Sequence, residues 1–123
     1  MAQLIVLAED DEDLGLVVKT KLEHSALRVV WKKTGDEAWE AILAEKPALA
    51  ILDADLPGVD GFEVLRRIKT SSETATIPVI MMSAIGHEAY VGNAMRGGAS
   101  DFVVKPFKTA DLMTRVERAL NVK

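Results

Sequence analysis

Leu49-Ala50-Ile51-Leu52-Asp53 is a run of four apolar residues that ends on a carboxylate. Three further apolar runs also stop at residues that handle phosphate or metal, namely Leu4 to Ala8 before Glu9-Asp10-Asp11, Val79 to Met82 before Ser83, and Phe102 to Val104 before Lys105. If the four runs are neighbouring parallel strands, their carboxyl ends lie at one edge of the sheet. The acids, the hydroxyl and the ammonium group then converge on one site that can hold a divalent cation and a phosphoryl group together.

Strand-like runs alternate with helix-like segments along the whole chain. The runs begin near Leu4, Arg28, Leu49, Ile77 and Phe102, and each is followed by apolar residues at helical spacing. The fourth helical segment, around Glu88 to Arg96, has the weakest pattern and contains Gly92. Continuous apolar strands that alternate with helices predict an α/β fold, a doubly wound five-stranded parallel sheet with five helices on its two faces.

The composition argues against several classes of protein. The 123 residues suit a single domain over residues 1–123, and 49% hydrophobic residues suffice for a core. A net charge of −4 without a polybasic tract argues against direct nucleic-acid binding, and the lack of cysteine excludes disulfides. No apolar stretch approaches the roughly 18 residues of a membrane span, and no signal peptide is visible. We therefore expect a cytoplasmic protein without membrane contact.

Glu9 and Asp10 follow the first predicted strand, and Asp53 follows the third. Doubly wound sheets bind ligands at the strand carboxyl ends where the strand order reverses, which selects these two loops. Carboxylates packed together raise each other's pKa, and a hard cation such as Mg²⁺ relieves that repulsion. The acids from Asp11 to Asp13 are better explained by the start of a helix, whose dipole favours negative charge. We expect Glu9, Asp10 and Asp53 to bind metal.

Asp53 can also serve as a nucleophile that accepts a phosphoryl group as an aspartyl phosphate. Such a transfer requires the charge on the phosphoryl oxygens to be neutralised. Lys105 offers an ammonium group for this, and Ser83 offers a hydrogen-bond donor. A serine at a strand end is more often a helix cap, and a lysine there is more often a surface residue. Only their joint placement with the acids supports a phosphoryl site.

Four motifs then match a known family. They are Leu7-Ala8-Glu9-Asp10-Asp11, Leu52-Asp53-Ala54-Asp55-Leu56-Pro57-Gly58-Val59-Asp60-Gly61, Met82-Ser83-Ala84 and Phe102-Val103-Val104-Lys105-Pro106-Phe107. With these motifs in this order and spacing, the chain resembles the receiver domain of bacterial two-component response regulators, including the chemotaxis-type single-domain receivers. The resemblance covers essentially all 123 residues and implies the flavodoxin-like strand order 2-1-3-4-5.

The resemblance also implies a role for each site residue. Asp53 would be the phosphoacceptor, and Asp10 and Asp53 would bind Mg²⁺ directly. Glu9 would bind the ion through a water molecule, and Asp55 would offer its backbone carbonyl. Glu9 stands where Asp is more frequent in the family, and Asp55 adds a carboxylate beside the acceptor. We hypothesise that the Asp55 side chain alters the lifetime of the phosphoryl group by steering or repelling the attacking water.

On the phosphoryl side, the resemblance makes Ser83 the switch hydroxyl and Lys105 the partner of another phosphoryl oxygen. Phe102 occupies the position of the switch aromatic residue, where the family more often has Tyr, so a hydrogen bond from a switch hydroxyl is absent there. The Lys105–Pro106 bond is expected to be cis. Phosphorylation would then change the surface made by the fourth helix, the fifth strand and the fifth helix.

The implied function is that of a phosphoacceptor in a two-component signalling system. A histidine kinase or a histidine phosphotransfer protein would donate the phosphoryl group, and a downstream protein or an output domain would respond. The same surface could form a homodimer. We expect no enzymatic activity other than phosphorylation and dephosphorylation of Asp53 itself. The cognate kinase, the target and the question of a stand-alone or an excised receiver stay open.

Two other functions also fit parts of this sequence. Asp53-Ala54-Asp55 after an apolar strand also resembles the motif of haloacid-dehalogenase-type phosphatases, but in those the motif usually follows the first strand. A degenerate receiver that binds partners without phosphorylation is the second alternative, and the intact acids with Ser83 and Lys105 argue against it. Trp31 is expected to be a packing residue away from the site.

Overall fold

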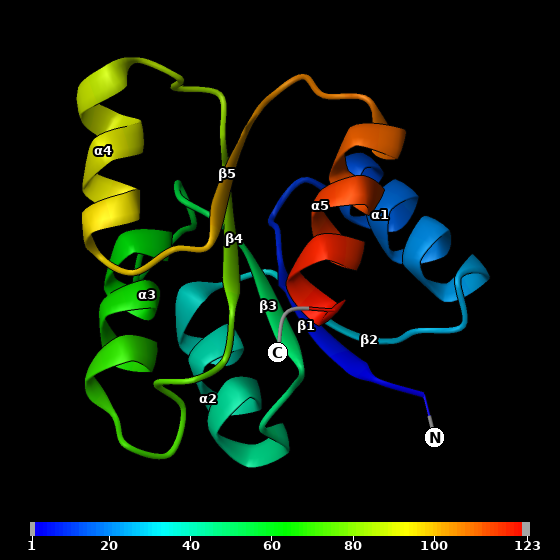
Figure 1. Ribbon diagram of the computed structural model, residues 1–123, viewed down its shortest axis with the longest axis horizontal. Helices are drawn as coiled ribbons and strands as arrows, with labels where there is room; N and C mark the ends of the chain where they lie inside the picture. Colours follow the sequence, from blue (N-terminus) through cyan, green and yellow to red (C-terminus); the bar gives the residue numbers. More distant parts are fainter. Residues whose placement is uncertain (1, 122–123) are drawn as a thin grey trace.

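The computed structural model describes residues 2–121, in which five strands alternate with five helices (Figure 1). The strands are β1 (Leu4–Ala8), β2 (Arg28–Lys32), β3 (Leu49–Asp53), β4 (Val79–Ser83) and β5 (Asp101–Val104). The helices are α1 (Glu12–His24), α2 (Gly35–Glu45), α3 (Gly61–Thr70), α4 (Glu88–Arg96) and α5 (Thr109–Asn121). The alternation expected from the apolar runs is confirmed.

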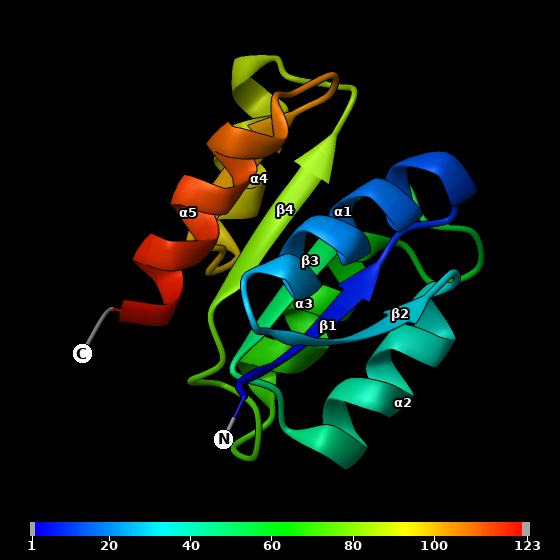
Figure 2. The ribbon, with the colours of Figure 1, turned by 90° about the vertical axis from the view of Figure 1, so that its right-hand side faces the viewer.

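All five strands run parallel in one sheet of order β2-β1-β3-β4-β5, which confirms the predicted fold class and strand order. The helices α1 and α5 lie on one face of the sheet, and α2, α3 and α4 lie on the other (Figures 1 and 2). The chain leaves β1 for one side and β3 for the other, so the order reverses between these two strands. The loops after β1 and β3 therefore flank the crevice in which such sheets bind ligands.

Two buried clusters fill the space between the sheet and its helices, because neighbouring strand residues point to opposite faces. Val6, Ala50, Leu52 and Met81 belong to the cluster beneath α2, α3 and α4. Ile5, Ile51, Ile80 and Met82 belong to the cluster beneath α1 and α5. Every residue of β3 and β4 is buried, as expected for strands covered on both faces.

Side-chain caps fix where three helices begin. Asp11 accepts a hydrogen bond from the Leu14 amide at 2.9 Å, Thr34 from the Glu37 amide at 3.2 Å, and Asp60 from the Glu63 amide at 2.9 Å. Each cap satisfies an amide that has no partner within its helix. The interpretation of Asp11 as part of a helix start is confirmed.

The fourth strand begins later than the apolar pattern predicted. The pattern placed its start near Ile77, whereas β4 begins at Val79. The Ile77 amide instead donates to the Thr74 carbonyl at 2.9 Å within a turn, and Pro78 has no amide hydrogen to offer. A polar turn and a proline thus delay the strand by two residues.

Among residues 2–121, no helix combines the length and the apolar character needed to cross a membrane.

Candidate functional site

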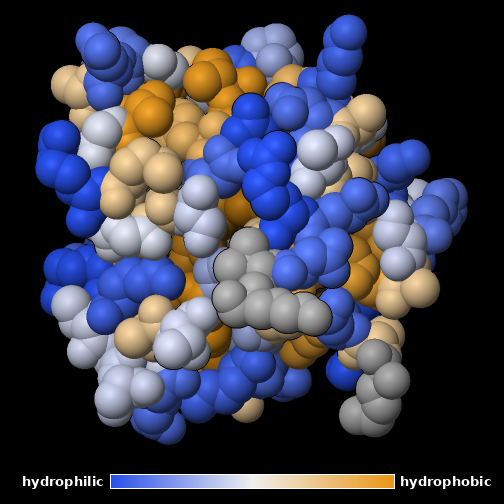
Figure 3. Space-filling view, viewed as in Figure 1, coloured by the Kyte–Doolittle hydropathy of each residue, from blue (hydrophilic) through white to orange (hydrophobic). Residues whose placement is uncertain are grey.

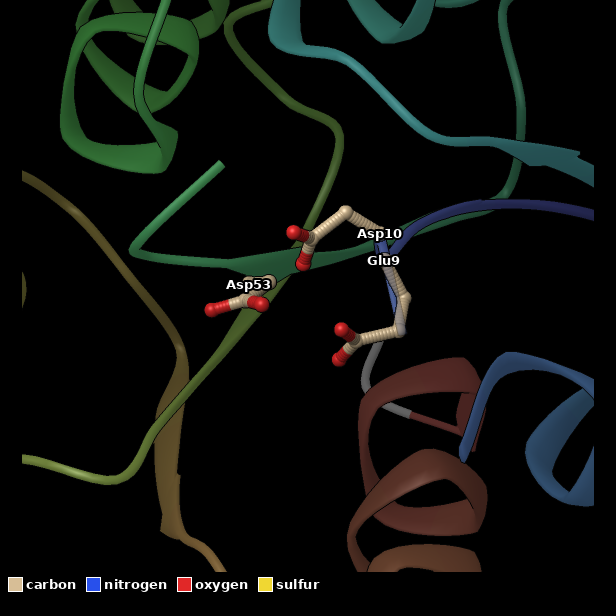
Figure 4. Close-up of side chains that lie close together, drawn as sticks. All are labelled: Glu9, Asp10 and Asp53. Atoms are coloured by element: carbon tan, nitrogen blue, oxygen red, sulfur yellow. The ribbon is translucent and has the colours of Figure 1, made fainter. Parts of the chain in front are cut away.

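Three carboxylates meet at the carboxyl edge of the sheet, as the sequence predicted. Glu9 and Asp10 directly follow β1, and Asp53 is the last residue of β3. One oxygen from each lies within 4.8 Å of the others, and the three side chains face a common space (Figure 4). Three hard oxygen donors at this spacing could hold a divalent metal ion.

Burial divides the three acids into two kinds. Glu9 is fully buried and Asp53 is 3% exposed, whereas Asp10 is exposed. Burial raises the pKa of Glu9 to about 7, although hydrogen bonds from Lys105 and from the Asp11 amide act in the opposite direction. The site therefore places two acids in a poorly solvated environment and leaves one side, at Asp10, open to solvent.

Lys105 is the counter-ion of the two buried acids. Its Nζ lies 2.7 Å from Glu9 Oε1 and 3.0 Å from Asp53 Oδ2. Burial by itself would lower the pKa of Lys105, but the hydrogen bonds and charges of Glu9 and Asp53 together outweigh it, so the pKa is raised and the ammonium form persists. The Lys105–Pro106 peptide bond is cis, as the resemblance implied.

Backbone amides complete the environment of the carboxylates. The Asp11 amide donates to Glu9 Oε2, and the Asp55 amide donates to Asp53 Oδ1, both at 3.0 Å. Gly61 allows the start of α3 to pass directly over the end of β3, since a Cβ at this position would lie 2.2 Å from the Asp53 carbonyl oxygen. The backbone of Asp53 is thus closely packed against the start of α3, while hydrogen bonds hold its side chain.

Ser83, the last residue of β4, is buried and contacts Asp55 through its side chain. Its Oγ donates to Asp55 Oδ2 at 2.9 Å and accepts a hydrogen bond from the Ile85 amide at 3.0 Å. The second oxygen of Asp55 accepts a hydrogen bond from Tyr90 OH at 2.7 Å. The structure thus links Ser83 to Asp55, and Lys105 to Asp53. The role of the Asp55 backbone carbonyl as a metal ligand stays a prediction.

Phe102 lies in β5 and is 8% exposed, packed in the cluster beneath α2, α3 and α4. Its ring stands edge-on to Tyr90, with 6.3 Å between ring centroids. The switching of this ring stays a prediction.

Sequence reasoning missed two residues beside the site. Tyr90 in α4 contacts Asp55, and burial together with the Asp55 carboxylate raises the pKa of its phenol to about 12. Trp31 was expected to lie away from the site, and this was wrong: its Nε1 donates to the Glu9 carbonyl at 2.8 Å. Trp31 could have been found from its place near the end of β2, the edge strand that pairs with the strand before Glu9 and Asp10.

The raised pKa of Glu9 predicts a pH-dependent stability. Between pH 4.5, its ordinary pKa, and about pH 7, the folded chain retains a proton that the unfolded chain releases. The free energy of unfolding should therefore fall as the pH rises through this window, by about 1 to 3 kcal/mol from this group. Urea unfolding in EDTA at several pH values measures it. The Glu9→Gln variant should lose this part of the slope, and equal slopes in both proteins would contradict the prediction.

Comparisons with known proteins agree with this geometry. Residues 5–117 match the family model described as "Response regulator receiver domain". The chain is 40% identical over 120 residues to the phosphate regulon transcriptional regulatory protein PhoB of Rhizobium meliloti, covering 98% of this chain and 53% of that protein. The chain therefore spans about half the length of the curated relatives that it matches.

Solved structures give the same result. The BeF3-activated N-terminal receiver domain of Klebsiella pneumoniae RstA has a TM-score of 0.89 and 30% identity, over 97% of this chain and 99% of that one. The receiver domain of the sensor histidine kinase PA1611 from Pseudomonas aeruginosa, with a magnesium ion coordinated in its active-site cleft, has a TM-score of 0.90 and 25% identity, over 99% and 100%. The resemblance drawn from the four motifs is confirmed, and this chain belongs to the family of response regulator receiver domains.

Proposed function

We propose that this receiver domain accepts a phosphoryl group on Asp53 from the phosphohistidine of a histidine kinase or of a histidine phosphotransfer protein. The single observation that carries the proposal is the contact of Lys105 Nζ with both Glu9 and Asp53 beside the open carboxylate of Asp10. A cation, a buried acceptor and an exposed acid in one place are the parts that phosphoryl transfer requires. Receiver domains are signalling domains, and no turnover of an external substrate is proposed.

The donor set fits Mg²⁺. Asp10 and Asp53 would bind the ion directly, Glu9 through water, and Asp55 through its backbone carbonyl. Asp10 is exposed, which leaves room for the water molecules that this ion retains. When bound, the ion would neutralise charge on the acids and on the phosphoryl oxygens.

The chain's own residues divide the remaining work. A carboxylate oxygen of Asp53 forms the new O–P bond while the P–N bond to the donor imidazole breaks and its electron pair returns to the nitrogen. Lys105, already 3.0 Å from Asp53, would pair with an oxygen of the transferred group. Ser83 would donate a hydrogen bond to another oxygen. Burial of Asp53 makes these fixed charges and donors more effective than they would be in water.

Output would pass through the surface formed by α4, β5 and α5. Exposed apolar side chains occur at Met95 in α4, at Val104 in β5 and at Ile85 in the loop before α4. The view of Figure 3 shows apolar atoms in the upper part of the molecule, over the ends of β4 and β5. A downstream protein or an output domain would bind this surface. A homodimer through it stays a prediction. Asp101 of β5 and Arg115 of α5 form an ion pair that joins two elements of this surface.

The test is to incubate the protein with Mg²⁺ and acetyl phosphate and to locate the label by mass spectrometry. We expect one base-labile phosphoryl group per chain, on Asp53. Repeated hydrolysis of unrelated phosphoesters would instead support the haloacid-dehalogenase-type phosphatase, which membership of the receiver family does not favour. A chain that takes no label would be a phosphorylation-independent interaction module.

The contacts of Asp55 give a physical reason to expect that its side chain alters the lifetime of the phosphoryl group. Its carboxylate holds the Ser83 hydroxyl, and it would repel a dianionic phosphoryl group on Asp53. The Asp55→Asn variant removes this charge at nearly constant size. We expect its phosphoryl group to persist about threefold to tenfold longer, the effect of about one hydrogen bond. Loss of label timed after removal of the donor measures this, and an unchanged rate would remove Asp55 from the explanation.

A further inference from the structure

The Asp55 carboxylate is shared by two hydroxyl groups from different elements. Ser83 at the end of β4 donates to Oδ2 at 2.9 Å, and Tyr90 in α4 donates to Oδ1 at 2.7 Å. Ser83 and Tyr90 lie 28 and 35 positions after Asp55 in the sequence. This carboxylate therefore joins the loop after β3, the end of β4 and the first turn of α4.

The Ser83 hydroxyl has one proton to donate, and Asp55 holds it. The same oxygen already accepts the Ile85 amide hydrogen at 3.0 Å, so its orientation is fixed from both sides. A phosphoryl oxygen on Asp53 would need this proton as well. Asp55 and the phosphoryl group are thus competing acceptors for a single donor.

Tyr90 is held rigidly enough to fix the orientation of Asp55. Its ring stands edge-on to Phe62 of α3 with 4.9 Å between centroids, and edge-on to Phe102 of β5 at 6.3 Å. His87 adds a third edge contact at 5.8 Å. Because the packed ring restrains the phenol oxygen, its hydrogen bond keeps the exposed Asp55 side chain turned toward Ser83.

We propose that Tyr90 is a positioning residue, which holds Asp55 in the orientation that captures the Ser83 hydroxyl and so opposes its engagement with a phosphoryl group on Asp53. The proposal rests on the proposed function of Asp53. A phosphoryl oxygen that takes the Ser83 proton breaks the Ser83–Asp55 hydrogen bond, and the charge added to Asp53 repels the Asp55 carboxylate. Phosphorylation of Asp53 then loosens the hydrogen bond between Tyr90 and Asp55, which ties α4 to the loop after β3.

The Tyr90→Phe variant tests this, because it removes one oxygen and keeps the packed ring. The probe is beryllofluoride in the presence of Mg²⁺, titrated by tryptophan fluorescence in a Trp39→Phe background, which leaves Trp31, whose Nε1 is bonded to the Glu9 carbonyl, as the reporter. We expect Tyr90→Phe to bind the probe about fivefold tighter than the wild type, since one restraining hydrogen bond is lost. Equal or weaker binding would overturn the proposal.

A double-mutant cycle separates positioning from a general structural effect. In an Asp55→Ala background, where no carboxylate is left to hold, Tyr90→Phe should change the affinity by less than about 1.5-fold. The same gain in both backgrounds would overturn the role of Asp55 as the intermediary. Thr114→Val is the matched control, because Thr114 donates to the Ala110 carbonyl in α5 at 3.0 Å, away from the site, and its loss should leave the affinity unchanged.

A measurement without metal tests the role of Tyr90 independently of beryllofluoride binding. In EDTA, amide NMR of Tyr90→Phe and of Asp55→Ala should both shift the Ile85 amide, which donates to Ser83, while Thr114→Val should not. An Ile85 amide that moves in neither variant would overturn the proposal. If the wild type itself binds no beryllofluoride and takes no label, the proposed function fails. If the wild type is labelled normally and Tyr90→Phe binds beryllofluoride with the same affinity as the wild type, only the role of Tyr90 is refuted.

Discussion

The Asp53→Asn variant is expected to take up no phosphoryl group from acetyl phosphate and Mg²⁺. An amide oxygen is not a nucleophile of comparable strength. Among residues 2–121, Glu9 after β1 is the other buried carboxylate that contacts Lys105, and its side chain has no exposed area through which a donor could reach it. Labelling measured by mass spectrometry should fall to the level of wild-type protein incubated without acetyl phosphate.

Asp55→Asn is the matched control for this loss. It makes the same carboxylate-to-amide change two residues away, and it should keep the label on Asp53. The far-ultraviolet circular dichroism of Asp53→Asn should match the wild type, because Lys105 retains Glu9 as a partner at 2.7 Å. Label that persists in Asp53→Asn at another residue, such as Asp10, would assign the acceptor elsewhere.

Replacing Lys105 by Met is expected to have the largest effect on stability. Glu9 is fully buried and Asp53 nearly so, and both would lose their cation. Removal of one partner from a buried ion pair costs about 3 kcal/mol or more, because the remaining charge is left uncompensated. Urea unfolding in EDTA should show this loss. Added Mg²⁺ should restore part of it, since the ion would take over the charge compensation.

The control for Lys105→Met is Lys19→Met, which breaks the exposed pair of Lys19 with Glu23 at 2.8 Å. An exposed pair of this kind contributes about 0.2 to 1 kcal/mol, so its loss should be small. Equal losses in the two variants would show that the environment of Lys105 is solvated. The Lys105 variant should also bind beryllofluoride more weakly, because a phosphoryl oxygen would lack its ammonium partner.

The fold could be predicted because its main signal is local. Four apolar runs that stop at chemically distinctive residues indicate buried parallel strands, and the strand order follows from the family that the motifs indicate. Glu9, Asp10 and Asp53 could be named for the same reason, since parallel strands bring their carboxyl ends together. The limits of the elements were less certain where a turn and Pro78 interrupt the apolar pattern.

The contacts beyond the strand ends could not be predicted, because they depend on side-chain direction. Tyr90 meets Asp55 across 35 positions of sequence, and Trp31 meets the Glu9 carbonyl across 22. Nothing in the local sequence marks either residue as part of a site. Tyr90 is an aromatic residue on a helix with a weak apolar pattern, and Trp31 is an aromatic residue in an edge strand. Only packing decides that their polar atoms turn toward the acids.

The two buried clusters on either side of the sheet share one wall, formed by the alternating side chains of β1, β3 and β4. Melting of the helices on one face would expose one side of these strands and so remove support from the cluster on the other. The two halves of the interior are therefore expected to unfold together, as a single cooperative unit. Asp53 is the last residue of β3, the central strand of that wall. A charge gained at Asp53 therefore acts on a strand whose side chains belong to both buried clusters.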